Sequence, residues 1–185
     1  MFIQTEATPN PATLKFLPGL TVLESGTADF RNPEDAAERS PLADSLFAVE
    51  GVTAVFLGSD FISVSKADLA DWAVMKPAVL GAIMEHFTRD LPVMAAGAQM
   101  AEAVSADGDP VIEQIQELLD TRVRPAVAGD GGDIVFRGFE DGIVYLSMQG
   151  ACAGCPSSTA TLKMGIENML RHYIPEVQEV RPAPF

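Results

Sequence analysis

The chain contains two cysteines, Cys152 and Cys155, with two residues between them. Thiolates are soft ligands that suit zinc, copper(I) and iron–sulfur clusters, and a pair at this spacing can also form a disulfide. Pro156 is typical of a first helical residue, because its missing N–H would be unpaired there anyway. Cys155 would then lie near a helix N-terminus, whose partial positive charge favours the thiolate. These residues indicate metal binding or dithiol chemistry, and inert cysteines are the plainest alternative.

The number of available ligands limits the kind of site. A closed zinc site or an ordinary iron–sulfur cluster takes about four protein ligands. His172 lies on the same predicted helix, roughly 25 Å beyond Cys155 at about 1.5 Å per residue, and His86 lies in another predicted domain. The simplest complete site therefore takes Cys152 and Cys155 from each of two chains. A cluster at such a seam is exposed and leaves by ligand exchange, as a carrier requires.

Two other functions would use the same cysteines. A thiol–disulfide oxidoreductase is the enzymatic alternative, although the pair does not follow the first strand of an obvious βαβ unit. A zinc-binding interaction module would hold about one zinc per two chains and have no redox activity. The hydroxyl residues Ser157, Ser158 and Thr159 have no histidine base nearby in sequence, so we expect helix capping or hydrogen bonds to sulfur from them rather than catalysis.

Composition excludes several classes of partner. The 185 residues carry a formal net charge of −14, and the acidic residues are spread evenly along the chain. Such a chain does not neutralise nucleic-acid phosphates and is not attracted to anionic membranes. No apolar run reaches the ~20 residues of a membrane helix. Two cysteines form no disulfide framework and the first residues do not resemble a secretory signal, so we expect a reducing, cytoplasmic compartment.

The N-terminal half predicts a small α+β domain. Asn32 and Ser40 each precede a proline, which is typical of helix starts. A glycine-containing turn near residue 58 predicts a hairpin. Trp72 and Met75 are expected to pack just before the longest helix. The expected elements are strands at 2–7, 13–17, 52–57 and 61–65, a candidate short strand at 21–23, two helices from Pro33 and Pro41, and a helix at 77–88.

The C-terminal half predicts a second α+β domain in the order α-β-β-α-β. Its glycine-rich segment 129–133 lacks the Gly-Lys-Ser/Thr of a phosphate loop, so we interpret it as a turn into a strand. The cysteines follow the second strand and precede a helix, which predicts that they are exposed. The expected elements are a helix from 109 to about 124, strands at 134–139 and 143–148, a helix at 156–172 with Leu162, Ile166, Met169, Leu170 and Tyr173 facing inward, and a strand at 177–180.

The predicted domains are 1–90 and 109–185, and residues 91–108 are expected to form the linker between them. This middle segment is rich in alanine and glycine and lacks a clear apolar period. The fold class is therefore α+β, with two small domains and relative domain motion between them.

Two parts of the chain, one in each half, resemble domains of a known family. Residues 124–134, read Arg-Pro-Ala-Val-Ala-Gly-Asp-Gly-Gly-Asp-Ile, precede Gly-Ala-Cys-Ala-Gly-Cys-Pro-Ser-Ser-Thr at 150–159. Together they resemble the C-terminal domain of NifU-like (NFU-type) iron–sulfur proteins. The front segment Gln-Thr-Glu-Ala-Thr-Pro-Asn-Pro at 4–11 and the turn at 17–19 resemble the N-terminal domain of the mitochondrial and alphaproteobacterial members.

The resemblance implies a non-enzymatic cluster scaffold and carrier. Cys152 and Cys155 would bind a [4Fe–4S] cluster between two subunits, with self-association as a dimer or higher. The cluster would come from the upstream assembly machinery and pass to apo iron–sulfur clients. The N-terminal domain would help to select those clients. No presequence precedes the first strand, so the resemblance implies a bacterial cytoplasmic protein or a processed form from the mitochondrial matrix.

Overall fold

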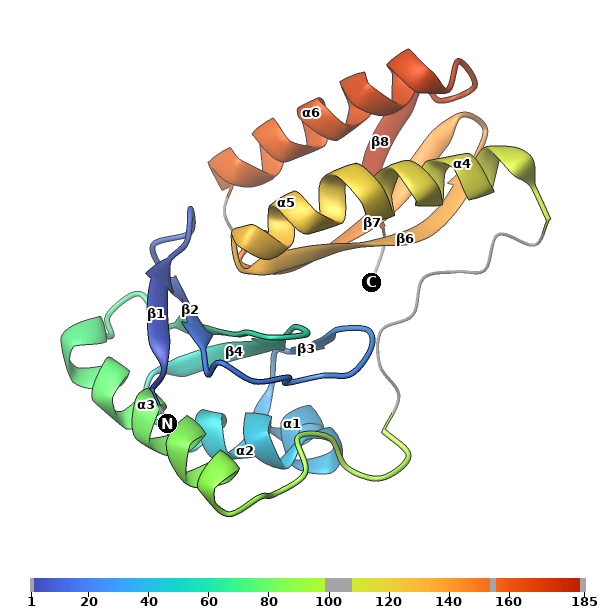
Figure 1. Ribbon diagram of the computed structural model, residues 1–185. Helices are drawn as coiled ribbons and strands as arrows, with labels where there is room; N and C mark the ends of the chain where they lie inside the picture. Colours follow the sequence, from blue (N-terminus) through green and yellow to red (C-terminus); the bar gives the residue numbers. More distant parts are fainter. Residues whose placement is uncertain (1, 99–107, 154–155, 184–185) are drawn as a thin grey trace. The chain divides into compact units, whose positions relative to one another are not determined.

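The computed structural model describes residues 2–98, 108–153 and 156–183, and for residues 156–159 it describes the backbone. The chain divides into two compact units, unit 1 at Met1–Ala101 and unit 2 at Glu102–Phe185 (Figure 1). Each unit combines a β-sheet with helices, which confirms the predicted α+β class. Among the helices described, none has both the length and the apolar character needed to cross a bilayer.

Unit 1 is built on a five-stranded sheet in the order β1-β2-β5-β4-β3, in which every neighbouring pair is antiparallel. Strands β4 and β5 form the hairpin that the sequence predicts, with Leu57 opposite Ile62. The strands are β1 (Gln4–Ala7), β2 (Thr13–Leu17), β3 (Ala28–Phe30), β4 (Val52–Leu57) and β5 (Ile62–Lys66).

Three helices, α1 (Pro33–Arg39), α2 (Pro41–Phe47) and α3 (Trp72–Thr88), lie on one face of this sheet (Figure 1). The first two begin as the sequence predicts. The side chain of Asn32 accepts a hydrogen bond from the Asp35 N–H and that of Ser40 from the Ala43 N–H, and a proline follows each cap.

Two predictions for unit 1 were wrong. Residues 21–23 form no strand, although Val22 and Leu23 are buried, and both N–H groups donate to the Ser59 carbonyl. Apolar residues in a loop can anchor to the core without joining the sheet, and β3 lies later in the chain. Helix α3 begins at Trp72 instead of Pro77, because Asp71 caps it and Pro77 is accommodated inside its second turn.

Part of the segment expected to be a linker packs against unit 1. Val93 and Met94 contact the buried cluster of that unit. Ser40 Oγ donates to the Val93 carbonyl at 2.6 Å, and the Ala95 N–H donates to the Arg39 carbonyl at 2.8 Å. The ordered part of unit 1 therefore continues beyond its last helix.

Unit 2 begins with one helical rod made of three segments, α4 (Pro110–Leu118), a π-helical turn η1 (Leu119–Val123) and α5 (Arg124–Gly129). The predicted end near residue 124 was wrong. Pro125 has no N–H to continue the α-helical ladder, and the Arg124 N–H instead donates to the Leu119 carbonyl, five residues back. The rod then continues to the glycine-rich turn.

A three-stranded sheet carries the rest of unit 2. Strands β6 (Gly132–Glu140) and β7 (Ile143–Gly150) are antiparallel, and β8 (Glu179–Pro182) pairs with β7 in parallel. The parallel pairing requires a crossover, which helix α6 (Pro156–Tyr173) supplies. The predicted order helix–strand–strand–helix–strand is confirmed.

The core of unit 2 lies between this sheet and its helices. On the rod it takes Ile115, Leu119 and Val123, as the sequence predicts. On α6 the inward residues include Ile166 and Leu170, whereas Tyr173 is 43% exposed, so its predicted inward position was wrong. The ring of Tyr173 instead lies 5.0 Å from the Arg122 guanidinium carbon in a cation–π contact, which lets it stay at the surface.

Candidate functional site

Cys152 lies two residues after the end of β7, in the loop that leads to α6. Its exposed fraction is only 7%, and it belongs to the same buried cluster as Ile134 and Ile166. The prediction that the loop exposes both cysteines was therefore wrong for Cys152, because this part of the loop folds back onto the core. Cys155 lies outside the described residues.

The glycine-rich turn between α5 and β6 lies directly beside the cysteine loop. Gly131 and Gly150 both have positive φ, +81° and +63°, which glycine adopts without strain. The Ala151 N–H donates to the Gly131 carbonyl at 3.2 Å, and the Ala153 N–H donates to the Gly150 carbonyl at 3.1 Å. The glycine-rich segment is thus the turn that the sequence predicted, and it also supports the cysteine loop.

Gly132 lies directly against Cys152. The two residues meet because Gly132 pairs with Gly150 in the β6–β7 register, next to the start of the loop. A β-carbon on Gly132 would lie 2.6 Å from the Cys152 sulfur and 2.7 Å from the Gln149 carbonyl oxygen. Sequence reasoning missed this role. The signal was the second of two consecutive glycines, where a turn alone requires only one.

An ion pair fixes the same turn from the other side. The Arg124 guanidinium donates to both carboxylate oxygens of Asp133 at 2.9 Å, and the carboxylate side chain is only 5% exposed. Asp133 Oδ1 also accepts from the Ile134 N–H at 2.8 Å. Hydrogen bonding to Asp133 raises the pKa of Arg124 above its ordinary value, against the effect of burial. The pair ties the start of α5 to the start of β6.

The other predicted candidates are not brought to the cysteine loop in the described part of the chain. His86 is buried in unit 1, 2% exposed, and stacks edge-on against Phe87. His172 lies at the last turn of α6, edge-on to Tyr173. Within the described residues, no three His, Cys, Asp or Glu side chains converge as a metal site. The side chains of Ser157, Ser158 and Thr159 fall outside the described set.

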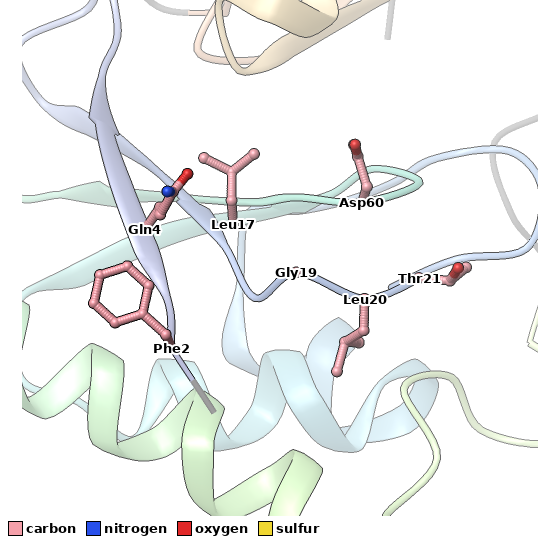
Figure 2. Close-up of a pocket in the computed structure, with 7 residues that line it drawn as sticks. All are labelled: Phe2, Gln4, Leu17, Gly19, Leu20, Thr21 and Asp60. Atoms are coloured by element: carbon pink, nitrogen blue, oxygen red, sulfur yellow. The ribbon is translucent and has the colours of Figure 1, made fainter.

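Unit 1 carries a separate pocket of about 550 Å³ near the start of its sheet. Figure 2 shows Gln4, Leu17 and Asp60 projecting to one side of the chain segments that form it, with Phe2 two residues before β1. Phe2 is 81% exposed. The residues that line this pocket include no thiol or histidine, so it offers no soft metal ligand.

Both units of the chain match known protein families. Residues 3–90 match the family model described as "Scaffold protein Nfu/NifU N terminal", and residues 115–181 match "NifU-like domain". A human protein named "NFU1 iron-sulfur cluster scaffold homolog, mitochondrial" is 54% identical over 181 residues, covering 97% of this chain and 71% of the human protein.

The chain belongs to the NFU family of iron–sulfur cluster scaffold proteins. Similarly named members from Drosophila ananassae and Drosophila virilis are each 54% identical over 182 residues and 97% of this chain. The chain spans 63% and 61% of the length of those two relatives. The NFU family is one of scaffolds rather than enzymes, so membership does not favour the oxidoreductase alternative.

Proposed function

We propose that this chain carries a [4Fe–4S] cluster held between two subunits by Cys152 and Cys155, and transfers it to apo iron–sulfur proteins. The observation that carries the proposal is the presence of two thiols, in the β7–α6 loop, in a chain of the NFU scaffold family. The cluster is cargo, and the chain supplies the ligands and the surface from which the cargo leaves.

The stoichiometry of ligands supports sharing. A cubane cluster takes about four protein ligands, and one chain contains two cysteines. Two chains that each contribute Cys152 and Cys155 complete the set. A client that offers more ligands, or ligands held in better geometry, then draws the cluster away by thiolate exchange. Sharing between subunits keeps the cluster accessible to that client.

The burial of Cys152 adds a step to this function. A thiol that is 7% exposed does not reach a second chain, so cluster binding requires the loop beginning at Gly150 to open. The hydrogen bond from the Ala151 N–H to the Gly131 carbonyl is the contact that this opening breaks. Gly131 and Gly150 flank this hydrogen bond, and glycine has no β-carbon to restrict a change of the backbone angles there. In the closed loop the core shelters the thiol from oxidants.

Unit 1 has no cysteine, and we propose that it selects clients and contacts the upstream assembly machinery. The relatives are named as mitochondrial, and a reducing compartment keeps thiols available as ligands. We therefore propose that the chain works in a reducing compartment, either the mitochondrial matrix or a bacterial cytoplasm.

Anaerobic reconstitution with iron and sulfide tests the proposal. We expect about four iron and four sulfide per two chains, and, at a chain concentration low enough for the apo chain to be monomeric, a mass by light scattering that doubles on loading. Cys152→Ser and Cys155→Ser should each abolish loading, whereas Met164→Ser, at an exposed position on α6, should load normally. A full cluster in either cysteine variant, or one zinc per two chains with no bound sulfide, would contradict the proposal.

A further inference from the structure

Helix α3 of unit 1 carries apolar side chains on its outer side as well as on its core side, beside the exposed charged residues Lys76 and Glu85. Met75, Val79 and Ile83 face the core and are buried. On the side away from the core, Val74 is 75% exposed and Met84 is 42% exposed. A helix at the surface of a globular protein normally turns a polar face to water. The exposed apolar side chains on the outer face of α3 depart from that rule, and a partner that covered them would remove them from water.

The outer residues form one continuous stripe. Val74, Pro77, Gly81, Met84 and Thr88 are all exposed and recur three or four positions apart, which places them on one side of a helix. The stripe runs along the whole helix, which is 17 residues and about 25 Å long. A β-carbon added to Gly81 would meet nothing within 4 Å, so a second helix can approach closely at the middle of the stripe.

The charges at the two ends of α3 indicate what fits this stripe. Asp71 caps the N-terminus and Arg89 follows the last turn, and both are exposed. They lie eighteen positions apart, which is about five full turns, so they project from the same side of the helix. In an antiparallel pair related by a two-fold axis, residues on one side of a helix face the same side of its partner. Each Asp71 then faces Arg89 of the other copy.

The match is specific to a second copy of this helix. A two-fold axis near Gly81 forms the Asp71–Arg89 pair twice. It also packs the stripe of one copy against the same stripe of the other copy. Arg89 already pairs with Glu85 at 2.7 Å within the chain, so the new contact extends that pair into a network. The antiparallel arrangement also places each helix N-terminus, with its partial positive charge, near the C-terminus of the other.

We infer that the outer face of α3 is a self-association surface, on which α3 of a second copy docks antiparallel about Gly81. One pair of helices buries less than the ~1,200 Å² of a stable interface, so the apo chain pairs weakly and reversibly. The inference deepens the proposed function, because paired units 1 raise the effective concentration of the second pair of thiols. It stands on α3 alone and requires no cluster.

Sedimentation of the full-length apo chain, reduced and with chelator present, tests the pairing. We expect a monomer–dimer equilibrium that depends on concentration. Met84→Glu should weaken dimerisation at least tenfold, because it places a carboxylate in the stripe. Met164→Glu is the matched control, since it makes the same change at a methionine that is 65% exposed on α6 in unit 2, and it should have no effect. A chain that stays monomeric to ~1 mM, or equal effects of both variants, would overturn the inference.

The orientation has its own test. Asp71→Asn keeps a side chain that caps helices well and removes the charge, and Arg89→Gln removes the opposite charge. Each variant breaks both symmetric pairs, so we expect both to weaken dimerisation several-fold, with an effect that shrinks at high salt. Loss of affinity in only one of them, or in neither, would exclude the antiparallel arrangement. Unchanged thermal melts show that unit 1 still folds.

Cluster loading separates the two proposals. If α3 pairs the apo chains, Met84→Glu should still load a cluster, but only at a higher chain concentration than the wild type requires. A wild type that dimerises but loads no cluster refutes the proposed function and leaves the α3 surface intact. A wild type that loads a bridging cluster but shows no apo dimer refutes the surface and leaves the function intact.

Discussion

The sulfur of Cys152 lies 2.6 Å from the point where a β-carbon on Gly132 would stand. Real β-carbons do not approach other atoms so closely, so the thiol occupies the space that the missing side chain leaves. The loop that bears the thiol and the strand that begins at Gly132 are therefore fitted to each other. A substitution at either residue should therefore disturb the packing of the other.

Gly132→Ala should destabilise unit 2 by about 1–3 kcal/mol, because the new methyl group overlaps the Cys152 sulfur and the Gln149 carbonyl. Chemical denaturation followed by circular dichroism measures the loss. Gly138→Ala is the control on the same strand, since a β-carbon there meets nothing within 4 Å. Equal stability of the two alanine variants would contradict the close fit.

Cys152 should react slowly with alkylating reagents in the folded apo chain. Its sulfur is sheltered in the core, so modification waits for the loop to open. Mass spectrometry of Cys155→Ser, which leaves Cys152 as the remaining thiol, should show alkylation at least ~10-fold slower in buffer than in urea. Equal rates in the two conditions would mean that the loop is open at rest.

Cys152→Ser should also cost about 1–2 kcal/mol of stability, because it places a hydroxyl in an apolar site. The sequence alone predicted exposed cysteines, and at an exposed position this substitution would leave the stability nearly unchanged. Thermal unfolding of the apo variant beside Cys152→Ala separates the polar cost from the lost volume. A serine variant as stable as the wild type would support that earlier prediction.

Arg124→Gln should destabilise unit 2 by about 2 kcal/mol, since it leaves the carboxylate of Asp133 buried without its cation. The partly exposed guanidinium keeps the value below that of a fully buried pair. Arg171→Gln is the control. Its ion pair with Glu167 spans 4.0 Å at the surface and should contribute little. Urea denaturation measures both variants, and similar losses would argue against a special role for Arg124.

His86 should make unit 1 less stable in mild acid. Burial lowers its pKa below 6.5, against the smaller opposing effect of the backbone of Leu91 and Pro92. Below pH 6.5 the unfolded chain takes up a proton that the folded chain refuses, so stability falls as pH falls. The slope approaches ~1.4 kcal/mol per pH unit until the folded histidine titrates.

Denaturation of His86→Phe as a function of pH checks this assignment. The variant should lose the slope between pH 6.5 and the lower folded-state pKa, whereas His172→Asn, at an exposed histidine of unit 2, should keep it. A slope that survives in His86→Phe would assign the acid sensitivity to other groups.

Local signals predicted much of this fold, and long-range packing explains the failures. The caps at Asn32 and Ser40 and the glycine turns depend on neighbouring residues, so the sequence revealed them. The burial of Cys152 depends on Gly132, twenty positions away, and on the β6–β7 register that joins them. Val22 and Leu23 looked like a strand because apolar residues suit both a strand and a buried loop. The cysteine motif identified the proposed ligands, but it did not predict that Cys152 is buried.

The π-turn at Leu119–Val123 solves a problem of angular phase. Ile115, Leu119, Val123 and Val127 recur every four residues, and four residues of a regular α-helix rotate about 40° past a full turn. Three such steps would carry the last side chain roughly 120° around the rod. The wider π-helical turn rotates the chain less per residue, so it reduces this angular displacement. All four side chains thus stay buried, and the rod delivers the chain to its glycine turn beneath the thiol.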